Sequence, residues 1–381
     1  MKKILIVSDS LRTGGIQVSL RSFLKFLSNE KYDITLFLFN DSLKDSLNID
    51  NVKIISGTKL LKIISYTAEE ARKKGFVVFV IRKILALLCK VFSANFIYSI
   101  LFMFEKRIGN YDVAISYSNN ILDRSVYFGY NKYVLEKVDS RKKISYIHAD
   151  YTTIHFKISD REYKKFDSIW CVSNFVKQTF LKYNPDCEKK CKVVYNFIDE
   201  DKIKKIDKNP FNSKKFHIVT VGRLDQNKSQ INSINICKKL IEKGVNFDWY
   251  LLGEGPEMIK IKDAIEQNDL SKYIYILGNK DNVSDYLNFC DFFVSLSKSE
   301  SYGLAIAESL LLNKITIVKD MPVASEIIQN NGIICKTDDE IVEELYNLMV
   351  DSVYYKNIQK KSKLIFDNQK NLENVKNILN M

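Results

Sequence analysis

The chain has little of what interrupts regular structure. Among its 381 residues there are four prolines and thirteen glycines, and we find no linker-like tract, no low-complexity segment and no internal repeat. This excludes the disordered and repetitive classes of protein. The apolar fraction of 46% and the charged fraction of 27% are typical of a globular chain, and the length suits two domains of ordinary size.

Cysteine and histidine are too scarce and too scattered to predict a metal site. The seven cysteines are an odd number, and Cys187 and Cys191 form one close pair with no second pair to complete a zinc site. The three histidines stand apart from one another. We therefore expect reduced thiols, no bound metal and no cofactor.

A long apolar run is missing at the beginning of the sequence. Met1-Lys2-Lys3 is followed by an apolar run of four residues, which ends at Ser8-Asp9-Ser10. A secretory signal needs a longer apolar segment, so no signal peptide is expected. Together with the reduced thiols, this predicts a cytoplasmic protein.

Positive charge is confined to the first half of the chain. Residues 1–190 contain 32 Lys and Arg against 19 Asp and Glu, a net charge of +13. Residues 191–381 contain 26 against 27, a net charge of −1. A basic half implies a polyanionic partner, either a nucleic acid or an anionic membrane face.

An apolar segment with interspersed cations, residues 59–107, differs from the rest of the first half. Its cations are Lys59, Lys62, Arg72, Lys73, Lys74, Arg82, Lys83, Lys90, Lys106 and Arg107. The apolar stretch 91–104 is too short for a spanning helix. Two interpretations stay open: a basic amphipathic helix in the membrane interface, or a pair of helices packed on the first domain. The basic charge of the first half favours membrane contact over packing alone. We therefore expect an anionic membrane surface as the partner, no nucleic acid, and a peripheral protein on the inner face of the plasma membrane.

Short apolar segments alternate with helical patterns along the whole chain. The alternation of strands and helices predicts βα units and parallel sheets. The sequence thus predicts an α/β fold with two consecutive halves and a ligand cleft between them. The predicted strands are 3–7, 33–39, 52–55, 112–116, 143–147, 168–172 and 191–195, then 217–222, 248–253, 274–278, 292–296, 314–318 and 332–334.

The domain limits are predicted from the break between these two series of strands. Residues 204–213, rich in Lys, Asp and Asn, are predicted to connect an N-terminal domain, 1–203, to a C-terminal domain, 214–365. Within the first domain, 59–107 is predicted to be a helical insertion. Residues 366–381 are predicted to form a C-terminal helix that returns to the first domain.

Two glutamates eight positions apart, Glu300 and Glu308, flank a Tyr-Gly-Leu turn. The predicted strand 292–296 precedes Glu300, and a helical pattern begins after Gly303. We therefore expect Glu300 on the loop at a strand's carboxyl end, and Glu308 about one and a half turns into the helix. In a doubly wound sheet this loop faces the ligand crevice, and the N–H groups at the helix N-terminus can bind a phosphate.

Two cations follow the first strand of the second half. The predicted strand ends at Val221-Gly222 and is followed directly by Arg223. Lys228 comes five residues after this arginine. Arg223 can hold phosphate oxygens in a bidentate manner, and Lys228 can act as a point charge. The pair indicates a diphosphate site at the carboxyl end of the sheet.

Further candidates lie in the first half. Gly14 and Gly15 follow the first strand and precede a helix, and glycine lets backbone approach a phosphate closely. They are not a G-x-G-x-x-G fingerprint, so a dinucleotide cofactor is not supported. His148 follows another predicted strand, where it has either a structural or a binding role.

These motifs resemble those of one family, the retaining GT-B glycosyltransferases of the GT4 type, or glycosyl transferases group 1. Glu300 and Glu308 are similar to its E-x7-E motif. Gly222-Arg223 with Lys228 is similar to its pattern of Gly-Arg followed by Lys. The turn Gly253-Glu254-Gly255-Pro256 resembles its G-[DE]-G-P segment.

The resemblance implies a GT-B fold, in which two Rossmann-like doubly wound domains face a central cleft. The N-terminal domain would bind the acceptor and the C-terminal domain the donor. It also implies a retaining, metal-independent hexosyl- or N-acetylhexosaminyltransferase that uses a nucleotide-diphosphate sugar such as a UDP-sugar. The acceptor would be a glycan or a lipid-linked glycan of surface-polysaccharide assembly, as in capsule or lipopolysaccharide.

Roles for single residues come from the same resemblance. Arg223 and Lys228 would stabilise the departing nucleotide diphosphate. Glu300 would hold the sugar hydroxyls, and His148 would touch the transferred sugar. The remaining positions would bind other parts of the donor: the phosphates at Gly14, Gly15, Ser301, Tyr302, Gly303 and Leu304, the ribose at Glu308, and the base at Asn279 and Val283.

Two alternatives of other classes stay open. A GT-B relative such as a sugar-nucleotide epimerase or a phosphorylase would share the donor-binding residues. A basic membrane- or nucleic-acid-binding protein would explain the charge of the first half. The second alternative does not explain the Arg, Lys and Glu pattern in the neutral half.

Overall fold

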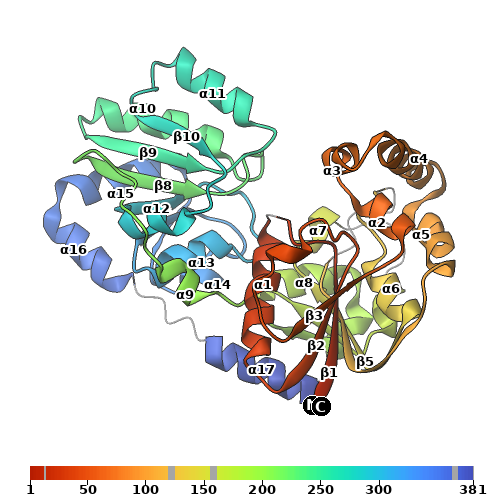
Figure 1. Ribbon diagram of the computed structural model, residues 1–381. Coiled ribbons are helices and arrows are strands. Elements are labelled where there is room, and N and C mark those ends of the chain that lie inside the picture. Colours follow the sequence, from red (N-terminus) through yellow and green to blue (C-terminus); the bar gives the residue numbers. More distant parts are fainter. Residues whose placement is uncertain (13, 119–124, 155–160, 363–367, 381) are drawn as a thin grey trace. The chain divides into compact units, whose positions relative to one another are not determined.

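The chain forms two compact units, which are described separately (Figure 1). Unit 1 comprises Met1–Phe197 and Asn368–Met381, and unit 2 comprises Ile198–Asp367, so the predicted connection 204–213 groups with unit 2. Residues 366, 367 and 381 of the predicted C-terminal helix lie outside the described residues. The computed structural model describes residues 1–12, 14–118, 125–154, 161–362 and 368–380.

Unit 1 contains a seven-stranded parallel sheet in the order β3-β2-β1-β4-β5-β6-β7. The order reverses between β1 and β4, which makes this pair a topological switch point. Residues 4–7 of β1 are fully buried, as expected for a parallel strand with both faces covered. The strands are β1 (Lys2–Ser8), β2 (Tyr32–Leu38), β3 (Val52–Ser56), β4 (Ile108–Ser116), β5 (Val138–Ile147), β6 (Ser168–Cys171) and β7 (Cys191–Val193).

Strands β4 and β5 begin earlier than the apolar pattern predicts. Their added residues, 108–111 and 138–142, are mostly polar and pair with each other, with a register shift between Ile108 and Tyr111. Strand β1 pairs with β4 only from Val113 onward. The early part of β4 therefore lies beyond β1 and carries no continuous apolar run that would reveal it.

Helices cover the sheet of unit 1. The buried face of α1 packs on aromatic side chains, with the Phe23 ring 5.4 Å from that of Tyr117 and 6.3 Å from that of Trp170. The helices are α1 (Gly15–Ser28), α2 (Lys59–Ser65), α3 (Ala68–Lys73), α4 (Phe76–Phe92), α5 (Ala94–Met103), α6 (Tyr130–Lys137), α7 (Tyr151–Ile154), α8 (Asn174–Tyr183) and α17 (Asn368–Asn380), with 3-10 turns at Lys44–Ser46, Tyr163–Lys165 and Pro185–Lys190.

The C-terminal helix α17 packs on unit 1, beside β1 (Figure 1). Lys2 donates from Nζ to the carbonyl of Leu379 at 2.8 Å, and Lys142 donates to the carbonyl of Ile378 at 2.6 Å. Cations are favourable at a helix C-terminus, where the last carbonyls have no partner within the helix. The buried face of α17 consists of Asn368, Asn371, Leu372, Val375, Ile378 and Leu379.

The segment 59–107 folds into four helices, α2 to α5, rather than the one or two that its composition suggested. Thr67 and Glu70 form a capping box at the start of α3, with the Glu70 carboxylate accepting from the Thr67 N–H at 2.7 Å. Among the described residues, no helix is long and apolar enough to cross a membrane.

Unit 2 repeats the same strand order with six parallel strands, β10-β9-β8-β11-β12-β13. Its core lies on the central strands, where Ile218, Trp249 and Val294 are fully buried. The strands are β8 (Phe216–Val221), β9 (Phe247–Leu252), β10 (Ile274–Gly278), β11 (Phe292–Ser295), β12 (Ile315–Lys319) and β13 (Ile333–Cys335). The helices are α9 (Glu200–Lys204), α10 (Ser233–Glu242), α11 (Met258–Gln267), α12 (Val283–Phe289), α13 (Leu304–Leu311), α14 (Ala324–Ile328), α15 (Asp338–Val350) and α16 (Ser352–Lys361), with a 3-10 turn at Gln230–Asn232.

Candidate functional site

The cations and the first glutamate that the sequence motifs mark as site residues of unit 2 lie at the carboxyl ends of two adjacent strands. Strand β8 pairs directly with β11, with Ile218 opposite Phe292. The strand order reverses between these two strands, so the pair is the switch point of the sheet. Arg223 and Lys228 follow β8, and Glu300 follows β11. Residues far apart in the sequence thus meet at one edge of the sheet.

Asp225 shapes the loop that follows β8. Its Oδ1 accepts from the backbone N–H groups of Asn227 and Lys228, each at 3.0 Å. The buried Gln230 donates from Nε2 to the carbonyl of Arg223 at 3.0 Å. The Arg223 side chain is 71% exposed, with Nε 4.0 Å from Oδ2 of Asp225. The loop backbone is therefore held in place while the guanidinium projects into solvent, where a ligand can reach it.

Glycine is required where the loop after β9 meets the loop after β8. The Leu224 N–H donates to the carbonyl of Glu254 at 3.0 Å. A Cβ on Gly253 would lie 2.1 Å from the carbonyl oxygen of Gly222, and a Cβ on Gly255 would lie 2.2 Å from that of Leu224. Such distances are sterically forbidden, so the Gly-Glu-Gly turn lets the two backbones touch.

Lys228 and Glu300 form an ion pair between the loops after β8 and β11. Lys228 donates from Nζ to Oε1 of Glu300, and Ser297 donates from Oγ to the same oxygen at 2.9 Å. Asn227 joins the two loops as well, because its Nδ2 donates to the carbonyl of Ser299 at 2.8 Å. An ammonium group has three protons, so Lys228 can also donate to an anionic ligand.

Helix α13 begins at the same edge of the sheet, as the sequence predicted. Gly303 is its N-cap, with a φ of +81° in the left-handed region that favours glycine. The predicted residues Ser301, Tyr302, Gly303 and Leu304 form the turn into the helix, and the Tyr302 side chain is buried. The first N–H groups of α13 have no partner within the helix and are suited to bind an anion.

Glu308 lies half-buried in α13. Burial raises its pKa to about 7, and the positive charge of Lys202 offsets this only in part. Among the described residues, no hydrogen bond or ion pair reaches the Glu308 carboxylate. The group is therefore poised to titrate near neutral pH and to accept hydrogen bonds from a ligand.

Asn279 and Val283 flank the loop after β10. Asn279 is exposed directly after that strand, and Val283 is the half-buried first residue of α12. The Gly253 N–H donates to the carbonyl of Gly278 at 2.8 Å, which ties this loop to the one after β9. The structure thus brings the predicted residues of unit 2 to one edge of its sheet.

Gly14 and Gly15 lie between β1 and α1, in unit 1. Gly14 is the N-cap of α1 and has an extended backbone, which any residue can adopt. A Cβ on Gly14 would meet the flexible Gln17 side chain at 2.5 Å rather than backbone. The local conformation does not demand glycine here, and close approach of a phosphate stays a prediction.

His148 lies in unit 1 between two tyrosine rings, 4.5 Å from the ring of Tyr117 and 4.2 Å from that of Tyr146. Burial lowers its pKa to about 3, although the Asn196 side chain acts in the opposite direction. His148 is therefore neutral at physiological pH. Ser19 of α1 donates from Oγ to Oδ1 of Asn196 at 2.6 Å, which links His148 to the helix behind Gly14 and Gly15.

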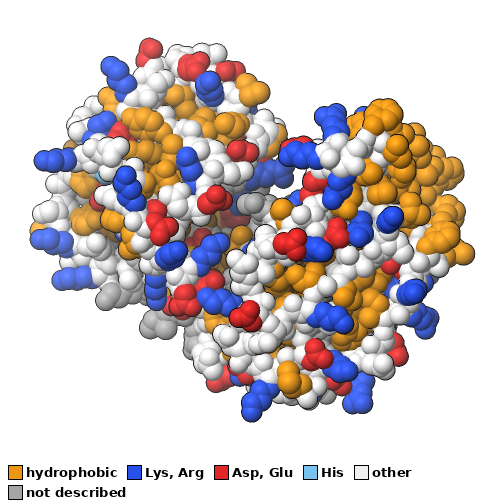
Figure 2. All heavy atoms as spheres, viewed as in Figure 1, with side chains coloured by type: hydrophobic (Ala, Val, Ile, Leu, Met, Phe, Trp, Pro, Cys, Tyr) orange, Lys and Arg blue, Asp and Glu red, His pale blue; other side chains and the backbone are white. Residues whose placement is uncertain are grey.

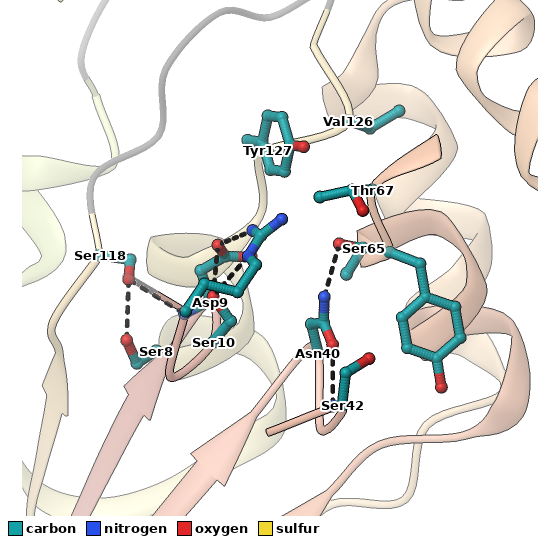
Figure 3. A network of polar contacts seen from close by, with 12 residues as sticks. Ser8, Asp9, Ser10, Asn40, Ser42, Ser65, Thr67, Ser118, Val126 and Tyr127 are labelled. Carbon is teal, nitrogen blue, oxygen red and sulfur yellow. Dashed lines mark hydrogen bonds and ion pairs between the residues drawn. The ribbon is translucent and has the colours of Figure 1, made fainter. Parts of the chain in front are cut away.

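A polar cluster at the end of β1 was missed in the sequence. Asp9 accepts on Oδ2 from Nη2 of Arg12 at 2.5 Å and on Oδ1 from the hydroxyl of Tyr130 at 3.1 Å. Its backbone N–H donates to Oγ of Ser118 at 3.0 Å (Figure 3). Burial opposes the charge of Arg12, but Asp9 and the Tyr127 hydroxyl outweigh it and raise the pKa of Arg12. The polar residues Ser8-Asp9-Ser10 directly after a buried strand were the signal that could have found the cluster.

Comparison with known sequences points to one family. Residues 201–364 match the family described as Glycosyl transferases group 1. An uncharacterised glycosyltransferase of Methanocaldococcus jannaschii is 27% identical over 165 residues, which cover 42% of this chain and 41% of that protein. The N-acetylgalactosamine-N,N'-diacetylbacillosaminyl-diphospho-undecaprenol 4-alpha-N-acetylgalactosaminyltransferase of Campylobacter jejuni is 26% identical over 180 residues, 46% of this chain and 48% of that protein. The chain thus spans about half the length of these curated relatives.

Solved structures match both units. Anabaena HepE in complex with UDP and glucose has a TM-score of 0.70 at 15% identity over 100% of both chains. A variant of S. aureus TarM, in complex with fondaparinux, alpha-GlcNAc-glycerol and UDP, has a TM-score of 0.66 at 12% identity over 100% of both chains. The predicted α/β class is confirmed: two Rossmann-like parallel sheets match GT-B glycosyltransferase structures. The comparisons together support the glycosyltransferase group 1 family.

Gly253→Ala tests the backbone contact between the loops after β9 and β8. Because the new Cβ would overlap the carbonyl oxygen of Gly222, we expect a loss of roughly 3 kcal/mol in the unfolding free energy of unit 2, measured by chemical denaturation. Gly244→Ala is the matched control, since Gly244 also has a positive φ but nothing within 4 Å of its Cβ position. Equal losses in the two variants would contradict the role of the contact.

His148→Phe tests the buried neutral histidine. The folded pKa of about 3 lies below the usual 6.5, so the stability contribution is present above pH 6.5 and is lost as the pH falls toward 3. Between pH 7.5 and pH 5 the original protein should lose about 2 kcal/mol more unfolding free energy in unit 1 than the variant, whose ring does not titrate. Parallel pH profiles of the two proteins would show that the pKa of His148 is not shifted by folding.

Proposed function

We propose that this protein is a glycosyltransferase that moves a sugar from a nucleotide-diphosphate sugar to a glycan or lipid-linked acceptor, with retention of anomeric configuration. The observation that carries the proposal is the meeting of Arg223, Lys228 and Glu300 at the switch point of unit 2. These residues lie within 201–364, the range that matches glycosyl transferases group 1.

The donor diphosphate is proposed to bind along this edge of unit 2. Arg223 offers an exposed, planar set of donors for phosphate oxygens, and Lys228 adds a second positive charge. The N–H groups at the start of α13 complete the anion site. These groups are fixed before the reaction and stabilise the charge that develops on the leaving diphosphate. We assign this charge stabilisation to the protein's own groups and not to a metal ion.

Glu300 is proposed to hold hydroxyls of the transferred sugar. Ser297 and Lys228 fix one of its oxygens, which leaves the other available as an acceptor. The acceptor hydroxyl would attack the anomeric carbon from the side of the leaving group. A new bond forms between the acceptor oxygen and this carbon as its bond to the phosphate oxygen breaks. The departing phosphate oxygen takes the acceptor's proton. His148 of unit 1 is proposed to contact the transferred sugar.

The nucleoside end of the donor is proposed to lie on Glu308, Asn279 and Val283. Glu308 would accept hydrogen bonds from the ribose hydroxyls, and the other two residues would contact the base. The matched structures contain UDP, which supports UDP-sugars as the first donors to test, for hexosyl or N-acetylhexosaminyl transfer. Screening nucleotide sugars for thermal stabilisation would identify the donor, since a ligand that binds the folded state raises its stability.

The acceptor is proposed to bind to unit 1. Gly14 and Gly15 would approach the donor phosphates, and the cluster of Asp9 and Arg12 offers charged and hydrogen-bonding groups for a glycan. The Campylobacter jejuni relative is named for an acceptor on diphospho-undecaprenol, which supports a lipid-linked acceptor and a role in surface-polysaccharide assembly. A peripheral position on the inner membrane face follows from such an acceptor. The alternatives, an epimerase, a phosphorylase or a non-enzymatic binding protein, find no support in the comparisons.

Arg223→Ala and Glu300→Ala test the catalytic assignment. Each variant should lower the rate of sugar transfer by roughly 100- to 1000-fold or more, because each removes a group that stabilises the transition state. The measurement is release of the nucleotide diphosphate and formation of glycosylated acceptor. The melting temperature of Arg223→Ala should change little, since the Arg223 side chain is mostly exposed. Glu300→Ala leaves Lys228 and Ser297 without their carboxylate partner and should lower the melting temperature, so its transfer rate is measured well below that temperature. Lys298→Ala and Glu254→Ala are matched controls for exposed charges at the same edge, and near-normal transfer by both test variants would refute the proposal.

Glu308→Gln tests the ribose contact through its pH dependence. The pKa of Glu308 in the protein is raised to about 7, and hydrogen bonds from ribose hydroxyls favour the ionised carboxylate. Binding of UDP should therefore release a proton, and the ratio of UDP affinities, original protein over variant, should rise about tenfold from pH 6 to pH 8. Titration calorimetry measures both quantities. Ionisation of the phosphate itself cancels in the ratio, and a ratio independent of pH would argue against the contact.

A further inference from the structure

Helix α4 exposes apolar side chains that a surface helix normally buries. Val77, Ile84, Leu87 and Val91 are 68%, 52%, 61% and 62% exposed. At 100° per residue these four positions lie within an arc of about 80° on one side of the helix. Cys89, the buried residue of α4, lies on the opposite side.

The exposed apolar surface continues onto α5 and the residues after it. The rings of Phe92 and Phe96 lie 6.3 Å apart and join the two helices. Figure 2 shows apolar side chains gathered over the region that Figure 1 labels α4 and α5. A contiguous apolar patch of this kind is rare on soluble monomers and marks an interaction site. We call this surface the α4–α5 face; it consists of Phe76, Val77, Ile84, Leu87, Val91, Phe92, Phe96, Ile100, Met103 and Phe104.

The polar groups of the same segment point the other way, into the protein. Asn40, directly after β2, donates from Nδ2 to Glu70 of α3 at 2.9 Å, and Figure 3 shows it beside Ser65 and Thr67. Arg82 of α4 donates from Nε to the carbonyl of Tyr66 at 2.9 Å. The Asn40 contact anchors α3 on the rest of unit 1, and the Arg82 contact ties α4 to the residue that follows α2.

The other end of the segment is anchored in the same manner. Lys62 pairs with Asp41 at 3.1 Å, and the buried Glu105 accepts from the N–H of Thr58 at 2.9 Å. The segment 59–107 therefore buries one set of apolar residues, among them Leu61, Tyr98 and Phe102, and makes polar contacts with the rest of unit 1, while it exposes a second apolar set on the α4–α5 face. The α4–α5 face is therefore presented by helices that are anchored on unit 1.

The charge around the α4–α5 face has one sign. No acidic residue occurs between Glu70 and Glu105, and the segment 59–107 contains ten Lys and Arg against three Glu, a net charge of +7. Lys83 and Lys90, both exposed, lie on one flank of the exposed apolar arc of α4. Further exposed cations precede α4 and follow α5 in the chain: Arg72, Lys73, Lys74, Lys106 and Arg107.

We propose that the α4–α5 face inserts into the headgroup and upper acyl region of an anionic bilayer, with Lys83 and Lys90 at the level of the lipid phosphates. Exposed aromatic and aliphatic side chains supply the apolar contact, and the cations supply the attraction to anionic lipid. A second copy of the chain fits less well, because a symmetric contact through this face would oppose cations to cations. Insertion is shallow, since α4 has seventeen residues and no helix of the described ranges can span a bilayer.

Docking in this way would bring unit 1 to acceptors that reside in the membrane. That consequence rests on the proposed function, whereas docking itself does not. Vesicle binding and sugar transfer are separate measurements. If the protein binds vesicles but transfers no sugar, the docking proposal stands and the proposed function fails. If it transfers sugar but does not bind vesicles, the proposed function stands and the docking proposal fails.

The test is flotation of the full chain with vesicles of phosphatidylcholine alone or mixed with phosphatidylglycerol. We expect binding to the anionic vesicles that weakens with salt but persists in part, because the apolar contact is not screened. The double variant Leu87→Gln and Val91→Gln should lower the partition coefficient at least about tenfold at low and high salt alike. The double variant Lys83→Gln and Lys90→Gln should lower it roughly thirtyfold on anionic vesicles at low salt, with little change on neutral ones.

Matched controls exist in unit 2. Val350 and Val353 are 55% and 66% exposed, so Val350→Gln with Val353→Gln removes comparable apolar surface elsewhere. Lys360→Gln with Lys361→Gln removes two exposed cations of α16. Both controls should bind anionic vesicles as the original protein does.

A spectroscopic variant reports the depth of insertion. Both natural tryptophans, Trp170 and Trp249, are buried, so Leu87→Trp adds an exposed reporter. Its emission should shift to shorter wavelength on anionic vesicles and be quenched by brominated lipid. Three outcomes would each overturn the proposal: absence of vesicle binding, binding by both α4 double variants as strong as that of the original protein, or a dimer that Leu87→Gln with Val91→Gln dissociates.

Discussion

The candidate site depends on the pairing of β8 with β11. These strands are neighbours in space, although Lys228 and Glu300 on the loops after them are 72 positions apart in the chain. Because the strand order reverses at this pair, the following helices leave toward opposite faces of the sheet, and the loops line a crevice at its edge. The Asn227 side chain then joins the two loops directly. Any other position of β11 would separate the cations from the carboxylate.

At the same edge of the sheet, close backbone contacts position the loop that carries the charged Arg223. Gly253 and Gly255 let one loop touch another without side chains between them, so the Arg223 loop rests on backbone rather than on mobile groups. At Glu308, by contrast, burial moves the pKa toward neutrality, and the charge of Lys202 offsets this only in part. In unit 1, Lys62 and Glu70 of the segment 59–107 contact Asp41 and Asn40 and anchor the segment. Other cations of the segment lie around its exposed apolar surface.

Much of the fold could be predicted because parallel strands are buried on both faces and appear as apolar runs. An apolar run of this kind predicted β1, and another predicted β11, the strand before Glu300. The pattern failed for the early parts of β4 and β5, which pair beyond β1 and are polar. The cluster around Asp9 was missed in part only because its local signal, the polar run Ser8-Asp9-Ser10 with Arg12 three residues after Asp9, was not used. The contact with Tyr130, 121 positions away, could not be predicted, because it depends on how distant segments pack.

By itself, the sequence determined the α/β class, the split of charge between the two halves and the candidate residues for the proposed chemistry, since these depend on local periodicity, composition and motif spacing. Tertiary structure decided which of those residues meet. The Lys228–Glu300 pair, the neutral state of His148 and the raised pKa of Glu308 all arise from contact and burial between distant segments. The outward direction of the α4–α5 face was decided in the same way. A helical pattern predicts that a helix has an apolar side. Packing alone decides whether that side faces the core or the protein surface.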